Sequence, residues 1–310
     1  MDRSIRHILT GAAALAGTFS AGSAAAAYAV MKQAAGGRRQ SYAEALAWQR
    51  EHGDLSWFRE EDLLRYTVTC GDGYVLHAAH LPCGDSDRFV ILTHGHTDNL
   101  YGSLKYAKIY LDLGFHVIVY DLRGHGENAP HFCSFSVLES GDLAAVVGDA
   151  KERFHPAVVG LHGESLGAAT TAAALERLGS QVQFAVCDCG FADFEMLMRY
   201  IATYRHLPEY TVNLASSMMK RRYGISFGEM HPAEHLRDNH IPTLFLHGGD
   251  DVFILPVHSS IMHRTTAGYS EFHIIPGAKH AASVFADRER YARYISTFMK
   301  SVLQETTQSP

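Results

Sequence analysis

Residues 158–175, VVGLHGESLGAATTAAAL, decide the fold of this chain. An apolar run over 157–162 leads to Gly163, and a stretch rich in Ala and Thr follows Gly167. This succession predicts a strand, a tight turn and a helix. Ser165 stands between the two glycines, which permit the close backbone approach that such a turn requires. The pattern therefore predicts a serine held in strained geometry at a helix N-terminus, where it can act as a nucleophile.

The same alternation of strands and helices continues on both sides of this turn. Two runs around Gly71-Asp72-Gly73 predict a hairpin, and continuous apolar runs predict strands covered on both faces. Ser136-Val137-Leu138-Glu139 has the pattern of a capping box and predicts a helix from there to about 154. We therefore expect an α/β fold with a mostly parallel eight-stranded sheet and helices on both faces. The expected strands are 65–70, 74–82, 89–94, 115–121, 157–162, 184–189, 243–247 and 271–276.

The composition divides the chain into three parts. Residues 1–32 have the pattern of a signal anchor or signal peptide, and residues 33–62 are polar and predict a linker with a short helix. Residues 63–310 carry the α/β pattern. Within them, residues 191–240 are rich in Met, Tyr and Phe and interrupt the alternation. An insertion of this length predicts a helical cap that binds substrate.

Charge and cysteine content exclude several classes of protein. The net charge of −6 over 310 residues argues against a nucleic-acid-binding protein, and the basic run Lys220-Arg221-Arg222 is typical of a solvated helix end. The five cysteines form no Cys-x-x-Cys pair, which excludes a zinc ribbon or a thioredoxin-like site. Cys187 and Cys189 are expected to share one face of a strand as buried thiols.

The N-terminal segment predicts export. Residues 8–31 carry no charge and are long enough for a helix to span a bilayer, although Ala, Gly, Ser and Thr dominate them. Retention as a membrane anchor, with the catalytic domain outside the cytoplasm, is the interpretation we favour. The alternative is secretion after cleavage at Ala25-Ala26-Ala27.

A serine nucleophile needs a histidine base and a carboxylate that orients it. In a fold with this type of turn, the chain order is Ser, then Asp or Glu, then His. Asp250 and Asp251 follow the strand at 243–247, and His280 follows the strand at 271–276. All three lie at the carboxyl edge of the predicted sheet, where open α/β folds bind ligands. Asp188, after the strand at 184–189, is a further candidate for the acid.

Four motifs resemble the α/β-hydrolase superfamily, in its serine aminopeptidase and monoacylglycerol-lipase-like branch. The resemblance extends over residues 65–303 and is closest to bacterial members with a short N-terminal membrane segment and a helical cap. The motifs are HGHTDN (94–99), YDLRGHGEN (120–128), GESLG (163–167) and HGGDD…GAKH (247–280).

The resemblance implies a role for each matching position. Ser165 corresponds to the nucleophile, His280 to the base and Asp251 to the acid. The backbone N–H groups of His96 and Leu166 correspond to the oxyanion hole. The branch has Val-Pro four residues after the acid, whereas here Pro256 lies one residue further on, which keeps Asp250 open as an alternative.

The resulting functional hypothesis is a serine hydrolase that cleaves a small-molecule ester or related acyl substrate through an acyl-enzyme. An acyltransferase or a serine aminopeptidase with the same triad is the alternative, followed by a catalytically inactive binding protein of the same fold. No cofactor is implied. Four of the 20 histidines fall near strand ends without the spacing of metal ligands, so no metal is expected. They are His94, His96, His162 and His247. The loop Arg123-Gly124-His125-Gly126 predicts a structural arginine that binds backbone groups.

Overall fold

The computed structural model describes residues 24–32 and 35–306, and the side chains of these up to residue 303. In chain order, its helices and strands are α2 (Tyr42–His52), η1 (Glu60–Asp62), β1 (Leu64–Thr69), β2 (Val75–Leu81), β3 (Arg88–Thr93), η2 (Leu100–Ser103), α3 (Leu104–Asp112), β4 (His116–Tyr120), α4 (Glu139–Phe154), β5 (Val158–Glu164), α5 (Leu166–Leu178), η3 (Gly179–Gln181), β6 (Phe184–Asp188), α6 (Phe194–Tyr204), α7 (Tyr210–Tyr223), η4 (Phe227–Glu229), η5 (Pro232–Leu236), β7 (Thr243–Gly248), α8 (Val257–Thr265), β8 (Ser270–Ile275), α9 (Ser283–Ala286) and α10 (Arg288–Thr306).

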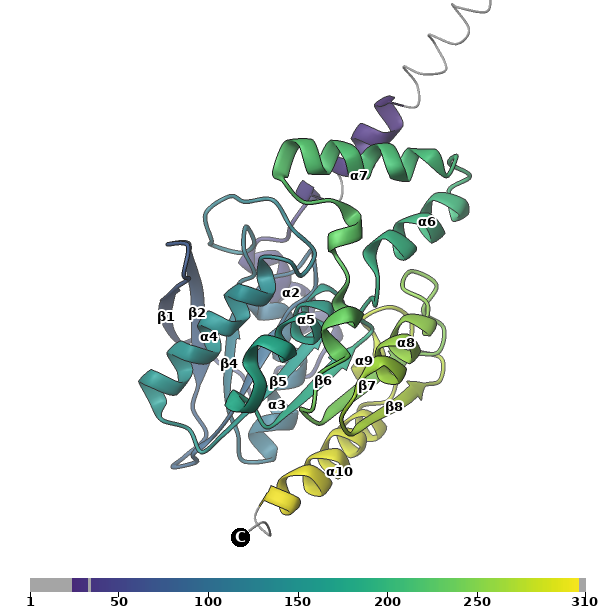
Figure 1. Ribbon diagram of the computed structural model, residues 1–310. Coiled ribbons are helices and arrows are strands. Elements are labelled where there is room, and N and C mark those ends of the chain that lie inside the picture. Colours follow the sequence, from purple (N-terminus) through teal and green to yellow (C-terminus); the bar gives the residue numbers. More distant parts are fainter. Residues whose placement is uncertain (1–23, 33–34, 307–310) are drawn as a thin grey trace, which may run out of the picture. The chain divides into compact units, whose positions relative to one another are not determined.

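The described residues fall into two compact units. One comprises residues 38–194 and 230–306, and the other comprises 24–32, 35–37 and 195–229. The first unit contains the whole sheet (Figure 1). We call it the α/β unit and describe each unit by itself.

The sheet of the α/β unit has eight strands in the order β1-β2-β4-β3-β5-β6-β7-β8. β2 is antiparallel to both of its neighbours, and the strands from β4 to β8 run parallel to one another. Parallel strands require covered faces, and β4, β6 and β7 are buried at every residue. The predicted α/β fold with a mostly parallel eight-stranded sheet is therefore confirmed.

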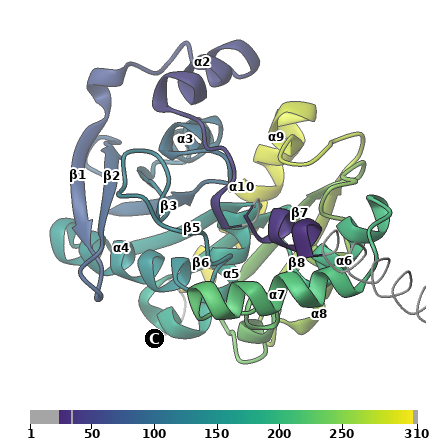
Figure 2. The ribbon, with the colours of Figure 1, turned by 90° about the horizontal axis from the view of Figure 1, so that it is seen from above.

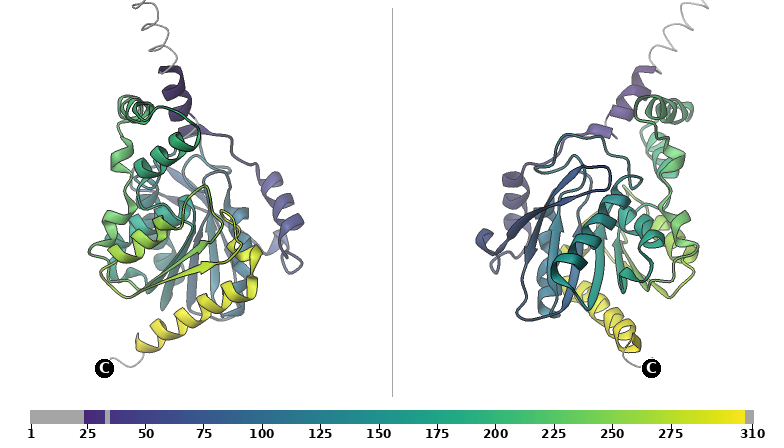
Figure 3. Two further views of the ribbon diagram at one scale, coloured as in Figure 1. Left: turned by 90° about the vertical axis from the view of Figure 1, so that its right-hand side faces the viewer. Right: turned by 60° about the vertical axis from the view of Figure 1, so that its left-hand side comes forward.

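Helices cover both faces of this sheet (Figure 2). Alternate strand residues such as Val90 and Leu92 join one core with side chains from α2, α3 and α10. The helices α4, α5 and α8 lie on the opposite face. In the left view of Figure 3, α10 (yellow) lies against the strands, and in the right view the teal helices α4 and α5 lie in front of them. The carboxyl ends of the parallel strands consequently form one edge, from which the loops of the candidate site emerge.

The Ala/Thr-rich stretch after Ser165 forms α5, whose residues are almost all buried. Small side chains let this helix pack closely against the sheet. The residues Ala168, Ala169, Ala172 and Ala174 have no exposed surface. The packing explains why the helix that follows the Ser165 turn consists mainly of small and apolar residues.

The start of α4 differs from the sequence prediction. The prediction of a capping box at Ser136–Glu139 is wrong. α4 begins at Glu139, and the side chain of its N-cap residue, Leu138, makes no capping hydrogen bond. Ser136 has a left-handed φ of 89°, and its N–H donates to the Glu139 carboxylate. The N–H of Ser134 donates to the same carboxylate. Glu139 therefore holds the preceding loop, while Ser136 caps no helix.

The segment predicted as a linker, residues 33–62, contains a helix that belongs to the core. Ser41 caps α2 through a capping box with Glu44. Ala45 and Leu46 of α2, with Leu55 and Phe58 after it, are buried in the core cluster that includes α3 and α10. The polar composition of this segment reflects the solvent-facing side of α2.

Most of the predicted membrane segment, residues 8–31, lies outside the described residues. Residues 24–32 are helical. Within the described part of the chain, no helix is both long and apolar enough to cross a bilayer.

The second unit contains α6 and α7, which lie within the segment predicted as a cap, residues 191–240. Arg199 of α6 binds Glu195 on its own helix, and it also binds Glu209 and Asn213, which ties α6 to α7. Gly224 ends α7 with a left-handed φ of 79°. Two helices and the short η4 thus occupy the place where the strand pattern is interrupted.

The packing of β5 against β6 gives a stability prediction. A Cβ at Gly160 would overlap the ring of Phe184, which is fully buried on β6 and has no space to move. We expect Gly160→Ala to lower the free energy of unfolding by about 1–3 kcal/mol. Gly148→Ala is the matched control, because a Cβ there meets nothing within 4 Å and lies inside α4. It should raise stability by about 0.5–1 kcal/mol. Urea unfolding followed by circular dichroism measures both, and equal effects would contradict the packing argument.

Candidate active site

Ser165 lies at the turn between β5 and α5, with a φ of 54° and a ψ of −113°. This left-handed φ is strained for a residue with a side chain. The flanking glycines are required by contact. A Cβ at Gly163 would overlap the Gly167 carbonyl, and a Cβ at Gly167 would overlap the Thr93 carbonyl at the end of β3. The turn therefore forms only with glycine at both positions.

Ser165, His280 and Asp251 form a chain of hydrogen bonds. The Oγ atom of Ser165 lies 3.0 Å from Nε2 of His280. The Nδ1 atom of His280 lies 2.7 Å from Oδ2 of Asp251. The three come from the loops that follow β5, β8 and β7. The structure thus brings together three side chains that lie far apart in the sequence.

Asp251 is buried and ionised. Its Oδ1 atom accepts hydrogen bonds of 2.9 Å from the N–H groups of Phe253 and Ile254. Burial raises the pKa of Asp251, but hydrogen bonds from His247 and His280 more than offset it and hold that pKa well below its ordinary value. Because an ionised carboxylate only accepts, Nδ1 of His280 carries the proton and Nε2 is free to accept the Ser165 hydroxyl proton.

Sequence reasoning missed the contact of His247 with Asp251. The Nε2 atom of His247 lies 2.8 Å from the Ile254 carbonyl and 3.2 Å from Oδ2 of Asp251. Because both of these atoms are acceptors, Nε2 is the protonated nitrogen and Nδ1 accepts from the Ser259 hydroxyl at 2.7 Å. His247 therefore orients the acid, whereas the sequence predicted only a turn residue.

The three carboxylates considered for orienting His280 have different contacts in the structure. Asp250 is exposed, and its N–H donates to the Ala278 carbonyl. The buried carboxylate of Asp188 accepts from the Tyr291 hydroxyl at 2.9 Å and from the Ser283 hydroxyl at 3.2 Å. Asp251 is the one whose carboxylate bonds His280. The geometry accordingly favours Asp251 over the two alternatives.

The predicted oxyanion residues lie beside Ser165. Leu166 begins α5, so its N–H belongs to the positive end of that helix. His96 follows Gly95, where a Cβ would lie 3.6 Å from Cβ of Ser165. The His96 ring stacks on Phe135 at 5.2 Å. The loop after β3 therefore lies directly against the serine turn, and the oxyanion roles stay predictions.

A short segment before α2 holds this loop. The N–H of Gln40 donates to the Thr97 carbonyl at 2.9 Å, and the Asn99 side-chain amide donates to the Gln40 carbonyl at 3.1 Å. The Tyr42 hydroxyl donates to the Asp121 carboxylate, which also accepts from the Leu100 N–H at 2.8 Å. Sequence reasoning missed this segment because nothing in its polar composition indicates a long-range contact.

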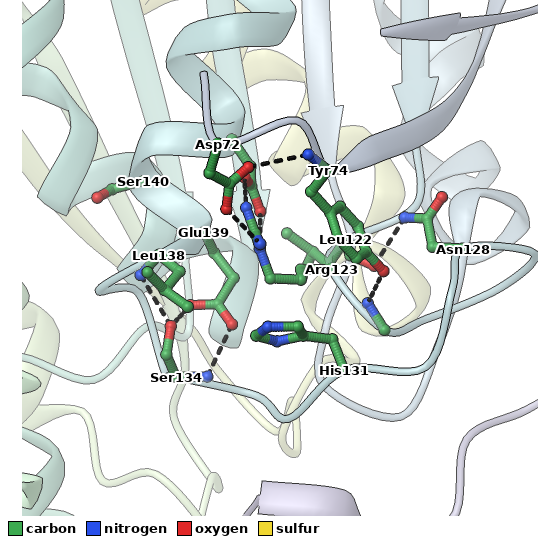
Figure 4. Close-up of polar contacts among 12 residues, drawn as sticks. Asp72, Tyr74, Leu122, Arg123, Asn128, His131, Ser134, Leu138, Glu139 and Ser140 are labelled. Atoms are coloured by element: carbon green, nitrogen blue, oxygen red, sulfur yellow. Dashed lines mark hydrogen bonds and ion pairs between the residues drawn. The ribbon is translucent and has the colours of Figure 1, made fainter. Parts of the chain in front are cut away.

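The arginine of the loop after β4 has a structural role, but its partners differ from the prediction. Arg123 binds carboxylates and not backbone groups. One is that of Asp142, and the other is that of Asp72, which Figure 4 shows beside Arg123. Its guanidinium also lies 4.3 Å from the centre of the Tyr74 ring. Asp72 is in the turn between β1 and β2, and Asp142 is on α4. Arg123 therefore links that hairpin to α4.

The sequence also led to a prediction about two cysteines. Cys187 and Cys189 are both buried free thiols. The expectation that they share one strand face is wrong, because Cys189 follows the end of β6 with a left-handed φ of 46°. Among the described side chains, Cys189, Asp251 and His280 are a group with the residue types of metal ligands, within 4.8 Å of one another. Two of the three belong to the hydrogen-bond chain described above.

Comparison with known proteins shows the family to which this chain belongs. Residues 84–223 match the family described as serine aminopeptidase, S33. The uncharacterized protein YqkD of Bacillus subtilis (strain 168) is 30% identical over 263 residues, which are 82% of this chain and 85% of that protein. The chain belongs to the α/β-hydrolase superfamily. Within this superfamily it is a hydrolase.

A further curated protein and two solved structures are also similar to this chain. The human protein ABHD12B is 29% identical over 178 residues, covering 54% of this chain and 46% of that protein. The Pyrococcus furiosus esterase Pf2001 superposes with a TM-score of 0.65 at 19% identity, over 81% of this chain and 96% of that one. Est1E from Butyrivibrio proteoclasticus, solved with ferulic acid bound, superposes with a TM-score of 0.60 at 16% identity, over 77% and 99%.

The position of Asp251 leads to a prediction about activity. Asp251→Asn keeps the shape of the side chain but removes the charge that fixes the His280 tautomer. We expect kcat/KM to fall by about 10⁴-fold. Asp250→Asn, at the exposed neighbouring position, should leave kcat/KM within about twofold. Steady-state kinetics on an activated ester measure both, and a larger loss in the Asp250 variant would assign the acid to Asp250.

The contact of Tyr42 with Asp121 leads to another prediction. Tyr42→Phe leaves the buried Asp121 carboxylate without one of its donors, so the free energy of unfolding should fall by about 1–3 kcal/mol. Tyr294→Phe on α10, where the ring stacks on His273 and is half-buried, should change it by less than about 0.5 kcal/mol. Urea unfolding at pH 7 compares the two. Equal losses would show that the contact of Tyr42 with Asp121 does not contribute to stability.

Proposed function

We propose that this hydrolase is a serine esterase that cleaves a small-molecule carboxylic ester through an acyl-enzyme, with Ser165 as nucleophile, His280 as base and Asp251 as acid. The observation that carries the proposal is the continuous hydrogen-bond chain from Ser165 Oγ through the His280 ring to Asp251. It is the arrangement that nucleophilic catalysis by a serine requires.

The geometry supports each chemical step. Nε2 of His280 takes the Ser165 hydroxyl proton as Oγ bonds to the carbonyl carbon of the substrate. The N–H groups of His96 and Leu166 stabilise the resulting oxyanion. His280 then gives its proton to the leaving alkoxide, and the C–O bond breaks. In the second half, His280 takes a proton from water, the hydroxide attacks the acyl-enzyme, and the proton returns to Ser165 as the acid leaves.

The serine aminopeptidase family match favours a second candidate, cleavage of an N-terminal amide by the same triad. An aminopeptidase also needs a carboxylate to bind the positively charged α-amine of its substrate. In the α/β unit, three buried carboxylates near the triad already have partners. Glu164 pairs with Lys105, Asp188 accepts from Tyr291, and Asp251 bonds His280. These pairings support an ester over a free amine.

The apolar surroundings of His280 support an acyl substrate. Phe253, with 51% of its surface exposed, lies edge-on to the His280 ring at 5.0 Å between ring centres. We further propose that the Met- and Tyr-rich segment 191–240 contributes to substrate binding. The N-terminal segment would anchor the protein to a membrane, with the catalytic domain outside the cytoplasm, or be cleaved on secretion.

A fluorophosphonate probe tests the proposal because it reacts with an activated serine. We expect wild-type protein to be labelled and Ser165→Ala not to be labelled. Ser296→Ala, which removes a serine of α10 that bonds the Arg293 carbonyl, should be labelled like wild type. Intact mass spectrometry measures the adduct, and absence of labelling in the wild type would refute a serine hydrolase.

The same preparation distinguishes the two candidate substrates. p-Nitrophenyl esters of increasing chain length are compared with aminoacyl p-nitroanilides. An esterase should show kcat/KM at least about 100-fold higher on the best ester once both are corrected for their uncatalysed rates. A higher corrected value on an anilide would assign the protein as an aminopeptidase.

A further inference from the structure

Strained backbone surrounds the candidate triad at three positions. Ser165, Cys189 and Ala281 are non-glycine residues with left-handed φ values of 54°, 46° and 57°. Ser165 is the proposed nucleophile, and Ala281 directly follows the proposed base. Each such residue costs of order 1–3 kcal/mol and persists only where surrounding contacts hold it. The contacts that hold these three residues therefore help to set the geometry of the site.

Lys105 of α3 makes contact on both sides of the Ser165–His280 pair. Its ammonium group forms an ion pair with the carboxylate of Glu164, the residue before the nucleophile. The same nitrogen lies 3.4 Å from the carbonyl oxygen of Ala281. The side chains of Lys105 and Glu164 are only 4% and 6% exposed. One buried cation thus links the serine turn to the histidine loop.

The residues around this pair form one connected network. The Tyr106 hydroxyl donates to Glu164 and lies 3.3 Å from Oδ2 of Asp188. Asp188 accepts from Ser283, three residues after His280, and its backbone carbonyl accepts the Ser165 N–H at 2.8 Å. The network therefore reaches both loops a second time, through Asp188.

Lys105 is the cation of this network. Burial lowers the pKa of Lys105, but the carboxylates of Glu164 and Asp98 more than offset it, so the pKa lies above its ordinary value and the ammonium stays charged. A buried ion pair is seldom a net source of stability, because hydrophobic residues of similar volume often serve as well. A directional contact to two loops is something that hydrophobic residues cannot supply.

We propose that Lys105 is a positioning residue that sets the distance and orientation between Ser165 and His280 by binding Glu164 and the Ala281 carbonyl at once. This role rests on the proposed serine-esterase function. Lys105 acts through the two loops and does not contact the reacting atoms.

The test is Lys105→Met, which keeps a long apolar side chain but removes the charge and its donors. Active sites are titrated with the fluorophosphonate probe, and kcat, KM and the labelling rate are expressed per titrated site. We expect kcat and the labelling rate to fall by about 10–100-fold, because small misplacements of catalytic groups are costly, and KM to stay within about threefold. Lys108→Met is the matched control, since Lys108 lies on the same helix and pairs with Asp112 at the surface.

A second variant covers the case in which Lys105→Met fails to fold around an unpaired Glu164. Lys105→Met/Glu164→Gln removes both charges of the ion pair, so that Glu164 is not left as a buried carboxylate without its cation. We expect this double variant to fold with near wild-type melting temperature but to retain the loss in kcat per site, because the Ala281 carbonyl stays unbound. A purely structural role would lower stability and leave kcat per site unchanged.

The outcomes separate this inference from the proposed function. If wild-type protein is labelled and turns over esters, and either folded Lys105 variant does so within twofold of it per site, the positioning role is refuted while the esterase stands. If the wild type is not labelled, the proposed function fails first, and the positioning role for Lys105 fails with it.

Discussion

The close approach of the Ser165 turn to the end of β3 is the constraint on which the rest of the site depends. Gly167 packs against the Thr93 carbonyl with no room for a Cβ, and Gly95 packs against the side of Ser165. These contacts fix the loop that carries His96 relative to the nucleophile. They also place the first turn of α5 beneath the serine, so that strand pairing between β3 and β5 determines where an oxyanion can form.

The surroundings of the buried carboxylates around this turn lower the pKa of one and raise the pKa of the others. Asp251 receives backbone N–H groups and two imidazoles, and its pKa lies below its ordinary value despite burial. For Asp188, burial and then the charge of Glu164 raise the pKa to about 6, and burial likewise raises the pKa of Asp121 to about 6. Asp251 differs from both in the two imidazole rings that bond its carboxylate, whereas Asp188 lies near the like charge of Glu164. A carboxylate that must stay ionised to orient a histidine is therefore the one that the fold surrounds with N–H groups, and this explains why Asp251 is better suited than Asp188.

The fold, and the placement of Ser165, Asp251 and His280 next to one another, were predictable from the sequence because they rest on local patterns. Apolar runs mark the strands, the glycines mark the turn, and chain order places Asp251 and His280 at the same sheet edge. The contacts of Lys105 and Tyr42 were not predictable, because the partners of each lie in other segments. His247 contacts Asp251 only four residues later, but nothing in the sequence indicates that the loop turns these two side chains toward each other. In a sequence, a buried lysine such as Lys105 looks the same as the exposed Lys108 three residues later. The start of α4 was predicted wrongly for a related reason, since the Glu139 side chain binds backward to the loop at Ser134 instead of capping a helix with Ser136.

Buried polar contacts in this α/β unit consequently have two distinct effects. The Arg123 cluster joins the β1–β2 hairpin to α4, far along the sheet from β7 and β8, and contributes to holding the fold together. The Lys105 network instead joins the two loops whose separation decides whether a proton can pass from Ser165 to His280. Because strained residues sit on both of these loops, relaxation of either loop would be favourable for the backbone and unfavourable for proton transfer. A buried lysine that adds little net stability can still oppose that relaxation. Movement of the serine turn would separate Lys105 from Glu164 and leave buried charges unpaired, and movement of the histidine loop would remove the Lys105 donor from the Ala281 carbonyl.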